Sequence, residues 1–311
     1  MKCLVTGGAG FIGSNLVDKL IDDGHEVVVV DNLSTGNKEN INPKATFENI
    51  DICNNIRDNK QKGWPSDGWN VMEGVDVIFH TAALARVQPS IEDPITYNDV
   101  NINGTLNLLK AAVDNGVKRF VYSASSSALG DTDKLPQMEN DPTDPISPYA
   151  VQKLVGEIYC RMFSEVHDIE TVSLRYFNVY GERMNLEGAY CLVMGIFAKQ
   201  MLDGKPMTIN GDGEQRRDFT YVGDVVNANI LAATSDKVGN GEVINIGNGD
   251  NRSVNQIADL FGGERVHRDP VKEPFASLAD NTKARELLGW KPTMEVEDWL
   301  IKYKEDLGLW K

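Results

Sequence analysis

Two side chains that could move a proton, Tyr149 and Lys153, stand four positions apart. In a helix this spacing puts them on one face. A free phenol has a pKa of about 10 and is a poor base at neutral pH, but a nearby ammonium favours the ionised phenolate and lowers that pKa. The pair could therefore take a proton from a hydroxyl group. By itself the spacing is common by chance and more often marks a solvated helix face.

Hydroxyl side chains follow an apolar, strand-like segment upstream of this pair. Residues 120–123 (FVYS) run directly into residues 124–127 (ASSS). In doubly wound folds, ligands bind at the carboxyl ends of parallel strands. We therefore expect the serine hydroxyls to lie at the same site as Tyr149.

A glycine-rich turn lies near the N-terminus, between an apolar run and a segment with helical periodicity. Gly7, Gly10 and Gly13 are spaced three apart, which allows a tight turn, close approach to a pyrophosphate and a helix N-terminus aimed at negative charge. Asp31 follows the next strand, 18 residues past Gly13, where a carboxylate accepts both ribose hydroxyls and repels a 2′-phosphate. These features favour NAD over NADP, although glycines also serve ordinary turns and Asp31 could cap a loop.

Strand and helix patterns alternate around these residues. The expected strands are 2–6, 27–30, 45–50, 75–79, 118–123 and 171–174, and the expected helices are 11–21, 101–113 and 148–165. Such alternation predicts parallel βαβ units in an α/β fold with a doubly wound parallel sheet. We expect this domain to cover residues 1–177, with 218–246 returning to it, and a smaller mixed α/β domain, mainly 178–311, to hold the substrate.

Composition limits the possible partners. The 311 residues carry a net charge of −15, and long-range repulsion argues against nucleic acid or anionic membranes as partners. The four cysteines form no Cys-x-x-Cys pair or His/Cys cluster with metal-ligand spacing. No apolar run reaches the roughly 20 residues that span a bilayer. We expect a cytoplasmic protein with no metal site.

Seven segments in order resemble the extended short-chain dehydrogenase/reductases, in particular the nucleotide-sugar epimerase/dehydratase family, over nearly the full length. They are 6–13 (TGGAGFIG), 51–52 (DI), 80–83 (HTAA), 101–105 (NINGT), 147–153 (SPYAVQK), 175–181 (RYFNVYG) and 217–222 (RDFTYV). Seven ordered matches are far more specific than one.

The resemblance implies a Rossmann domain that binds NAD. Asp51 and Ile52 would contact the adenine, residues 80–83 would line the cofactor cleft, and Lys153 would hold the nicotinamide ribose, while the positive nicotinamide would also favour the Tyr149 phenolate. The cofactor residues expected by resemblance are Gly7, Gly10, Phe11, Ile12, Gly13, Asp31, Asn32, Asp51, Ile52, Ala82, Ala83, Asn101, Ser123, Tyr149, Lys153 and Tyr176.

Ser125 falls on the catalytic Ser/Thr position of the family, beside Tyr149 and Lys153 in the catalytic set. Dehydratases of this family carry acidic residues directly after that position, where this chain has Ser126 and Ser127. Without an acid to protonate the departing C6 hydroxyl, elimination is disfavoured. The expected reaction is 4-epimerisation, in which Tyr149 removes the O4 proton, C4 is oxidised by NAD, and the 4-keto sugar rotates before reduction on its other face. Leu129 replaces the tyrosine that the family usually has before Gly130.

The resemblance also implies a nucleotide-diphosphate end of the site. Arg217 and Asn178 match phosphate-binding positions, the second arginine of the family falls on Pro270, and residues 205–213 match the segment that reads the base, which favours UDP. Ser277 stands where a bulky aromatic restricts N-acetylated sugars, and Leu192 could narrow the same space. The expected substrate residues are Arg86, Ser125, Ser126, Asn178, Leu192, Arg217 and Ser277.

Several alternatives stay open at this stage. UDP-glucose and UDP-galactose are the expected pair, with their N-acetylated counterparts as a further candidate. Arg86 could pair with a hexuronic carboxylate, which favours a UDP-glucuronate 4-epimerase, or it could face phosphate or solvent. A dehydratase, reductase or decarboxylase could use the same scaffold, and so could a non-catalytic NAD sensor. The family commonly forms homodimers, here through the helices 101–113 and 148–165.

Overall fold

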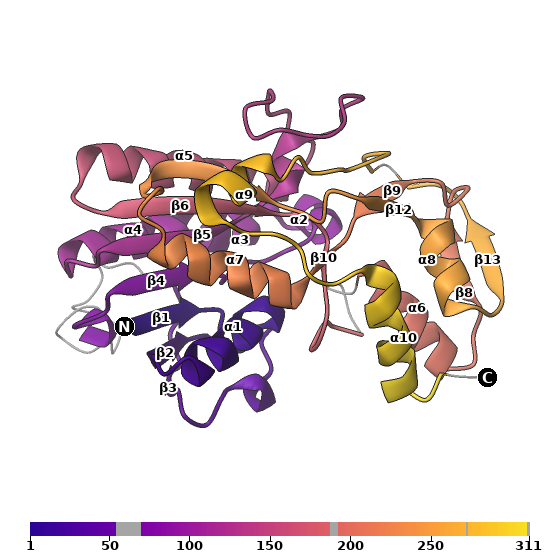
Figure 1. Cartoon of the computed structure of the whole chain (residues 1–311), viewed down its shortest axis with the longest axis horizontal. Coiled ribbons are helices and arrows are strands. Elements are labelled where there is room, and N and C mark those ends of the chain that lie inside the picture. Colours follow the sequence, from indigo (N-terminus) through magenta and orange to yellow (C-terminus); the bar gives the residue numbers. More distant parts are fainter. Residues whose placement is uncertain (54–69, 187–191, 272, 310–311) are drawn as a thin grey trace.

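A parallel sheet organises the larger part of the molecule (Figure 1). The computed structural model describes residues 1–53, 70–186, 192–271 and 273–309, and within these residues the main sheet has seven strands in the order β11-β6-β5-β4-β1-β2-β3. Every pairing in it is parallel. The strands are β1 (Lys2–Thr6), β2 (Glu26–Val30), β3 (Thr46–Glu48), β4 (Val77–His80), β5 (Arg119–Ser125), β6 (Glu170–Tyr176) and β11 (Asn240–Ile246).

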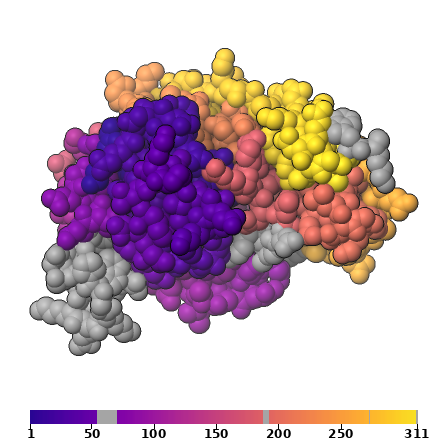
Figure 2. Space-filling view, turned by 90° about the horizontal axis from the view of Figure 1, so that it is seen from below, coloured from indigo at the N-terminus to yellow at the C-terminus, as the bar shows by residue number. Residues whose placement is uncertain are grey.

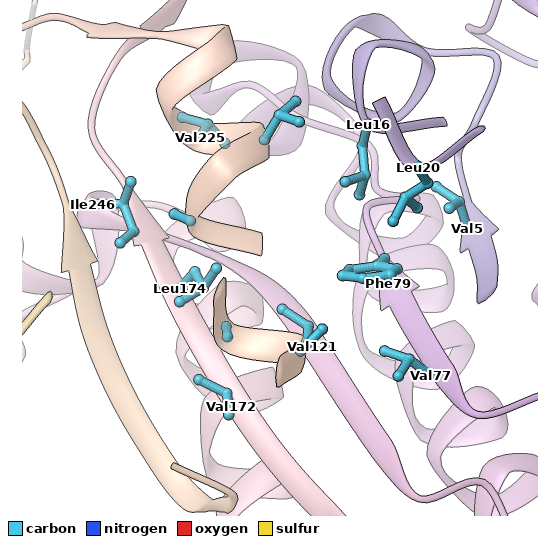
Figure 3. Close-up of a cluster of buried hydrophobic side chains, with 14 of the residues drawn as sticks. Val5, Leu16, Leu20, Val77, Phe79, Val121, Val172, Leu174, Val225 and Ile246 are labelled. Atoms are coloured by element: carbon cyan, nitrogen blue, oxygen red, sulfur yellow. The ribbon is translucent and has the colours of Figure 1, made fainter. Parts of the chain in front are cut away.

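Helices cover both faces of this sheet, as its alternating buried side chains require. Val5 and Phe79 point to one face, where Leu16 of α1 (Phe11–Asp22) and Val225 of α7 (Val222–Thr234) cover them (Figure 3). Successive strand residues point to opposite faces, so Leu4 packs on the other side with the side chains of α4 (Thr105–Asp114) and α5 (Pro148–Val166). The sheet is therefore doubly wound, as the sequence predicts.

The strand order reverses between β1 and β4, which puts two loops at the switch point of the sheet. One is the glycine turn after β1, and the other begins at Thr81 after β4. In folds of this type the crevice at the switch point is where ligands bind.

The remaining segments gather at one end of the molecule, on the right in Figure 1. Their core contains Tyr180, Phe197, Ile209, Phe261 and Trp299. Figure 2 shows these orange and yellow segments beside the indigo N-terminal mass. They comprise β7 (Val179–Tyr180), α6 (Val193–Leu202), β8 (Met207–Asn210), β9 (Arg216–Asp218), β10 (Thr220–Tyr221), β12 (Asn251–Ser253), α8 (Val254–Phe261), β13 (Arg265–Arg268) and α10 (Val296–Asp306), while α9 (Thr282–Leu288) returns to pack against α7 and β11.

The predicted strands and helices are present, with differences at their edges. The helix expected from residue 101 begins as a π-helical stretch, η4 (Asp99–Gly104), before α4. Two short helices that the sequence did not predict, α2 (Val87–Glu92) and α3 (Pro94–Asn98), precede it. Short 3-10 turns are η1 (Lys38–Asn40), η3 (Asn70–Met72) and η5 (Ser126–Leu129). In the described part of the chain, none of the helices is long and apolar enough to cross a membrane.

Candidate active site

A cleft of about 1140 Å³ opens at the carboxyl ends of the main-sheet strands and extends to the second group of segments. Most of the residues singled out from the sequence line it, so the fold brings them together from positions throughout the chain. They are Gly7, Gly10, Phe11, Ile12, Gly13, Asp31, Asn32, Asp51, Ile52, Ala82, Ala83, Arg86, Ser125, Ser126, Tyr149, Tyr176, Asn178, Leu192, Arg217 and Ser277.

The glycine turn is shaped for close approach by a ligand. Gly7 has φ +69°, and a Cβ there would lie 2.7 Å from the backbone nitrogen of Ala82. A Cβ on Gly13 would lie 2.2 Å from the carbonyl oxygen of Gly7. Gly10 is the N-cap of α1, so the first free N–H groups of a 12-residue helix face the cleft. A pyrophosphate fits this turn, because no side chains block its approach and the free N–H groups attract negative charge.

Asp31 is held in place at the end of β2. Its two carboxylate oxygens accept hydrogen bonds from the backbone N–H groups of Ala9, at 3.0 Å, and Leu33, at 2.8 Å. Next to it, the Asn32 amide donates to the Asp51 carboxylate at 3.1 Å. A fixed carboxylate beside the glycine turn has the position and charge that the two hydroxyls of an NAD ribose need, so these residues fit the cofactor.

Ser125 and Tyr149 meet where β5 ends and α5 begins. Ser125 is the last residue of β5, and its Oγ accepts hydrogen bonds from the backbone N–H and the hydroxyl of Ser127, at 3.2 and 2.9 Å. Helix α5 begins at Pro148 because the Ser147 hydroxyl caps it by accepting the Ala150 N–H. Tyr149 is therefore fixed in the first turn of the helix, close to the serine turn.

The pKa of the Tyr149 hydroxyl is raised above its usual value, mainly by burial. The hydrogen bond with Ser125 and the positive charge of Arg86 lower this pKa but offset only part of the effect of burial. The structure thus corrects the expectation that Lys153 lowers this pKa: the neighbouring cation is Arg86. A bound nicotinamide would add a second positive charge.

Lys153 points away from the open cleft because its ammonium has an internal partner. Its Nζ donates a 2.7 Å hydrogen bond to the Ser123 carbonyl oxygen and lies 5.1 Å from the centre of the Tyr122 ring. Burial lowers the pKa of Lys153 to about 8, and the nearby Glu157 carboxylate opposes that effect. Glu157 itself forms a buried bidentate pair with Arg175, at 2.8 and 2.7 Å.

Two other predicted cofactor residues, Asn101 and Ser123, also lie behind the wall of the cleft. The Asn101 amide donates to the Leu84 carbonyl and the Gln152 side chain, both at 2.9 Å. The Ser123 hydroxyl lies 3.1 Å from that of Tyr176. In the described structure these side chains support the cleft wall and do not line the cleft.

Arg86 lines the cleft from a strained backbone position. Its φ of +133° is rare for a residue other than glycine. It immediately precedes α2, and Ser90 of that helix accepts the backbone N–H of Tyr149 at 3.1 Å. The start of α2 is therefore tied to the start of α5, which explains why the charge of Arg86 acts on Tyr149.

At the far end of the cleft, Arg217 is held by several groups. Its guanidinium donates to the carbonyl oxygens of Arg216, at 2.8 Å, and Phe275, at 3.2 Å, and forms a 2.7 Å ion pair with Glu273. The Asn178 amide donates to the Asp218 carbonyl oxygen at 3.0 Å and lies 3.3 Å from the Ser277 hydroxyl. Sequence patterns gave no signal for Glu273, because it pairs with a residue 56 positions away.

The two departures from the family pattern have different places. Leu129 is buried and packs with Phe177 and Ala279, so it fills the core beneath the serine turn. Pro270 lies outside the cleft lining, near Gly211. Among the described residues that line the cleft, the arginines are thus Arg217, at this end, and Arg86, beside Tyr149.

Comparison with known proteins agrees with this geometry. A "Putative UDP-glucose 4-epimerase" of Methanocaldococcus jannaschii is 40% identical over 302 residues, which is 95% of this chain and 94% of that protein. A crystal structure of UDP-glucose 4-epimerase with UDP-glucose from Thermotoga maritima has a TM-score of 0.89 and 39% identity, and covers 98% of this chain and 99% of its own.

A UDP-N-acetylglucosamine 4-epimerase from Methanobrevibacter ruminantium, in complex with UDP-N-acetylmuramic acid, has a TM-score of 0.88 and 35% identity, and covers 99% of this chain and 97% of its own. The model of one family matches residues 3–247, a span that carries the glycine turn, the serine turn, Tyr149, Lys153 and Arg217. By this match, and by identity that extends over almost the whole chain, the protein belongs to the NAD dependent epimerase/dehydratase family.

Proposed function

We propose that this protein is an NAD-dependent 4-epimerase of a UDP-sugar, acting on the UDP-glucose and UDP-galactose pair and, as a further substrate, on the N-acetylated pair. The observation that carries the proposal is that Ser125, Tyr149 and Arg217 line one cleft with the glycine turn. The relatives described above, which are named for this reaction, support the proposal. It is also supported by Ser126 and Ser127, which stand where dehydratases of the family carry acidic residues.

Tyr149 is the proposed base for the sugar O4 proton. Burial raises the pKa of Tyr149, and Ser125 and Arg86 offset only part of that effect. The positive nicotinamide of bound NAD would favour the phenolate further, so that Tyr149 could take the proton as C4 is oxidised. Ser125 donates a hydrogen bond to O4 and stabilises the charge that develops there. Bound NAD supplies the reversible oxidation of C4. Lys153 donates to the Ser123 carbonyl oxygen near the end of β5, and by the family resemblance it would also hold the nicotinamide ribose of bound NAD.

The cofactor half of the cleft would be formed by the residues expected from the sequence. Gly7, Gly10 and Gly13 would bind the pyrophosphate, and Asp31 would accept the ribose hydroxyls. Phe11, Ile12, Asn32, Asp51, Ile52, Ala82, Ala83 and Tyr176 would complete the contact surface, as their place in the lining supports. We assign this half to residues 1–177 with 218–246, and the substrate half mainly to 178–311.

The substrate half has a cation, Arg217, and a small side chain, Ser277, in its lining. Arg217 would bind the diphosphate, aided by Asn178. Ser277 leaves more room than an aromatic side chain would, and this supports acceptance of an acetamido sugar, while Leu192 also lines the cleft and limits the space. A second candidate, UDP-glucuronate 4-epimerase, is favoured by one observation, which is that Arg86 lines the cleft next to Tyr149.

We also propose a cytoplasmic homodimer. Of the two helices expected at the interface, α5 exposes apolar side chains at Val151 and Ile158, whereas the described α4 exposes no large apolar side chain. The adjoining α3 adds Ile95, with 75% exposure. Such a face favours burial against the same face of a second copy. Light scattering tests the dimer, and Ile158→Glu should convert it to a monomer. Buried free thiols at Cys3 and Cys160 are compatible with a reducing compartment.

A product panel tests the proposed reaction. The enzyme is incubated separately with UDP-glucose, UDP-N-acetylglucosamine and UDP-glucuronate, and products are analysed by mass spectrometry and proton NMR. A C4 epimer of unchanged mass from the first two substrates is the expected result, and an epimer from UDP-glucuronate alone selects the second candidate. A product that has lost water or carbon dioxide would contradict epimerisation and identify a dehydratase or a decarboxylase. No product from any of the sugars would favour a non-catalytic NAD-binding protein.

A further inference from the structure

Gln137 is a buried polar residue in the wall of the cleft that no motif identifies. It is 2% exposed, and it lines the same cleft as Ser125, Ser126 and Tyr149. It follows Pro136 in a loop between the serine turn and α5. Glutamine side chains are rarely enclosed to this extent, so its place in the wall calls for a reason.

The main chain of Gln137 is fully occupied. Its N–H donates to the Leu278 carbonyl oxygen at 2.7 Å, and its carbonyl oxygen accepts from the Asp280 N–H at 2.9 Å and from the Asn245 amide at 3.0 Å. These bonds form a parallel bridge between Gln137 and Ala279. The backbone is therefore held rigidly, and only the side chain is left to interact with a ligand.

The side-chain oxygen of Gln137 has no hydrogen-bond partner among the residues that the structure describes, although it is buried. Folded proteins pair nearly all buried polar atoms, and an exception needs an explanation such as a ligand. Because the two ends of an amide exchange by rotation, either the oxygen or the nitrogen can face the cleft. The side chain thus offers an acceptor and a donor at one place in the wall.

The neighbours of Gln137 place it between the two ends of the site. Gln137 and Ala279 are paired in a parallel bridge, and paired residues point to the same side of a sheet. Residues two apart in an extended segment also point to the same side, so Ser277 shares this side with Ala279. Ala279 packs against Leu129, the last residue of the serine turn η5. Gln137 therefore lies between the turn that follows Ser125 and the part of the wall that contains Ser277.

We propose that Gln137 is a substrate-recognition residue, whose side-chain amide hydrogen-bonds a hydroxyl or acetamido group of the hexose in a nucleotide-sugar. The ligand is the sugar, and the nucleotide and the cofactor are bound by other residues. The bond satisfies an oxygen that the folded protein otherwise leaves unpaired, so it favours the sugar-bound state. The proposal rests on the proposed function for the identity of the substrate class.

Isothermal titration calorimetry on the NAD-loaded enzyme tests this role, with UDP and UDP-glucose as the two probes. Gln137→Met keeps the length of the side chain and removes both polar atoms. We expect UDP-glucose affinity to fall about tenfold in this variant, as for loss of one hydrogen bond, with UDP affinity unchanged. Met138→Gln makes the reverse exchange at the adjacent exposed residue and should bind both probes as the wild type does.

Thermal unfolding separates this role from a structural one. Removing an unpaired buried oxygen should leave the Tm of Gln137→Met equal to or above that of the wild type, whereas loss of a structural contact would lower it. If the methionine variant does not fold, Gln137→Asn, which keeps a neutral amide but shortens its reach by one methylene, serves in its place and should also lower the affinity for UDP-glucose and leave that for UDP unchanged. Wild-type affinity of Gln137→Met for UDP-glucose, or an equal loss for UDP and UDP-glucose, would overturn the proposal.

The outcome is distinguishable from failure of the proposed function. If Gln137→Met loses sugar affinity while the wild type makes no C4 epimer in the product panel, Gln137 recognises the sugar of an enzyme with a different reaction. If the wild type forms the C4 epimer and Gln137→Met binds UDP-glucose and UDP as the wild type does, the proposed reaction is supported and the proposed role of Gln137 is wrong.

Discussion

The buried His80 makes the stability of the protein depend on pH. It is buried at the end of β4, with one ring nitrogen 2.8 Å from the Thr6 hydroxyl and the other 2.8 Å from that of Thr105. Burial, helped by the positive charge of Lys153, lowers the pKa of His80 to about 3. In the unfolded chain the pKa is about 6.5, so acid protonates the unfolded state first. Stability from His80 is complete above that value and is lost as the pH falls toward 3.

The size of the effect follows from the two pKa values. Between about pH 8 and about pH 5, the unfolded histidine gains its proton while the folded one stays neutral, which lowers the free energy of unfolding by about 2 kcal/mol. Asp218 acts in the opposite direction: burial raises its pKa to about 6, so its contribution to stability is lost as the pH rises through 6. The pH dependence of the free energy of unfolding of the wild type therefore contains contributions from both His80 and Asp218.

Urea unfolding of the wild type and His80→Asn at both pH values isolates the histidine. Asparagine can still bond one of the threonines, so the variant should fold, less stably, and lack the histidine titration. The difference in free energy of unfolding between the two proteins should be about 2 kcal/mol smaller at the acid pH. The same difference at both pH values would show that His80 titrates normally in the folded protein and would refute the reasoning.

Three further predictions concern the two ends of the cleft. Gly13→Ala places a Cβ 2.2 Å from the Gly7 carbonyl oxygen, so NAD retained after purification should fall at least about tenfold, and unchanged NAD content would contradict the fit. Asp31→Asn removes a charge that repels a 2′-phosphate, so the ratio of NAD to NADP affinity, measured by calorimetry, should drop about tenfold; a constant ratio would oppose this role. Arg217→Ala should raise the KM for UDP-glucose by about 10- to 100-fold with kcat changed far less, and a loss confined to kcat would place Arg217 elsewhere in the mechanism.

The parts that sequence predicted well are local. The glycine turn, Asp31 and the first turn of α5 are each set by neighbours in the chain, since β1, Gly10 and the Ser147 cap act over a few residues. The order of parallel strands then carries these local features to one edge of the sheet.

What sequence did not predict depends on contacts between distant segments. Glu273 is a counter-ion to Arg217 only because a late loop returns to β9, and Gln137 is enclosed only because its segment pairs with Ala279. The pKa expectation for Tyr149 was wrong about Lys153 for a similar reason. The spacing of the two residues is that of one helical face, but the Ser123 carbonyl from β5 holds the ammonium, and the cation that acts on Tyr149 comes from the start of α2.

The most direct test of the account is turnover by Tyr149→Phe. The variant keeps the ring and removes the hydroxyl, and it is compared with the wild type at equal NAD content and equal Tm, with conversion of UDP-glucose to its C4 epimer followed by proton NMR. Loss of the base should lower kcat by about 10²- to 10⁴-fold with little change in UDP affinity. Turnover near that of the wild type, with the fold and the bound NAD intact, would contradict the role of Tyr149.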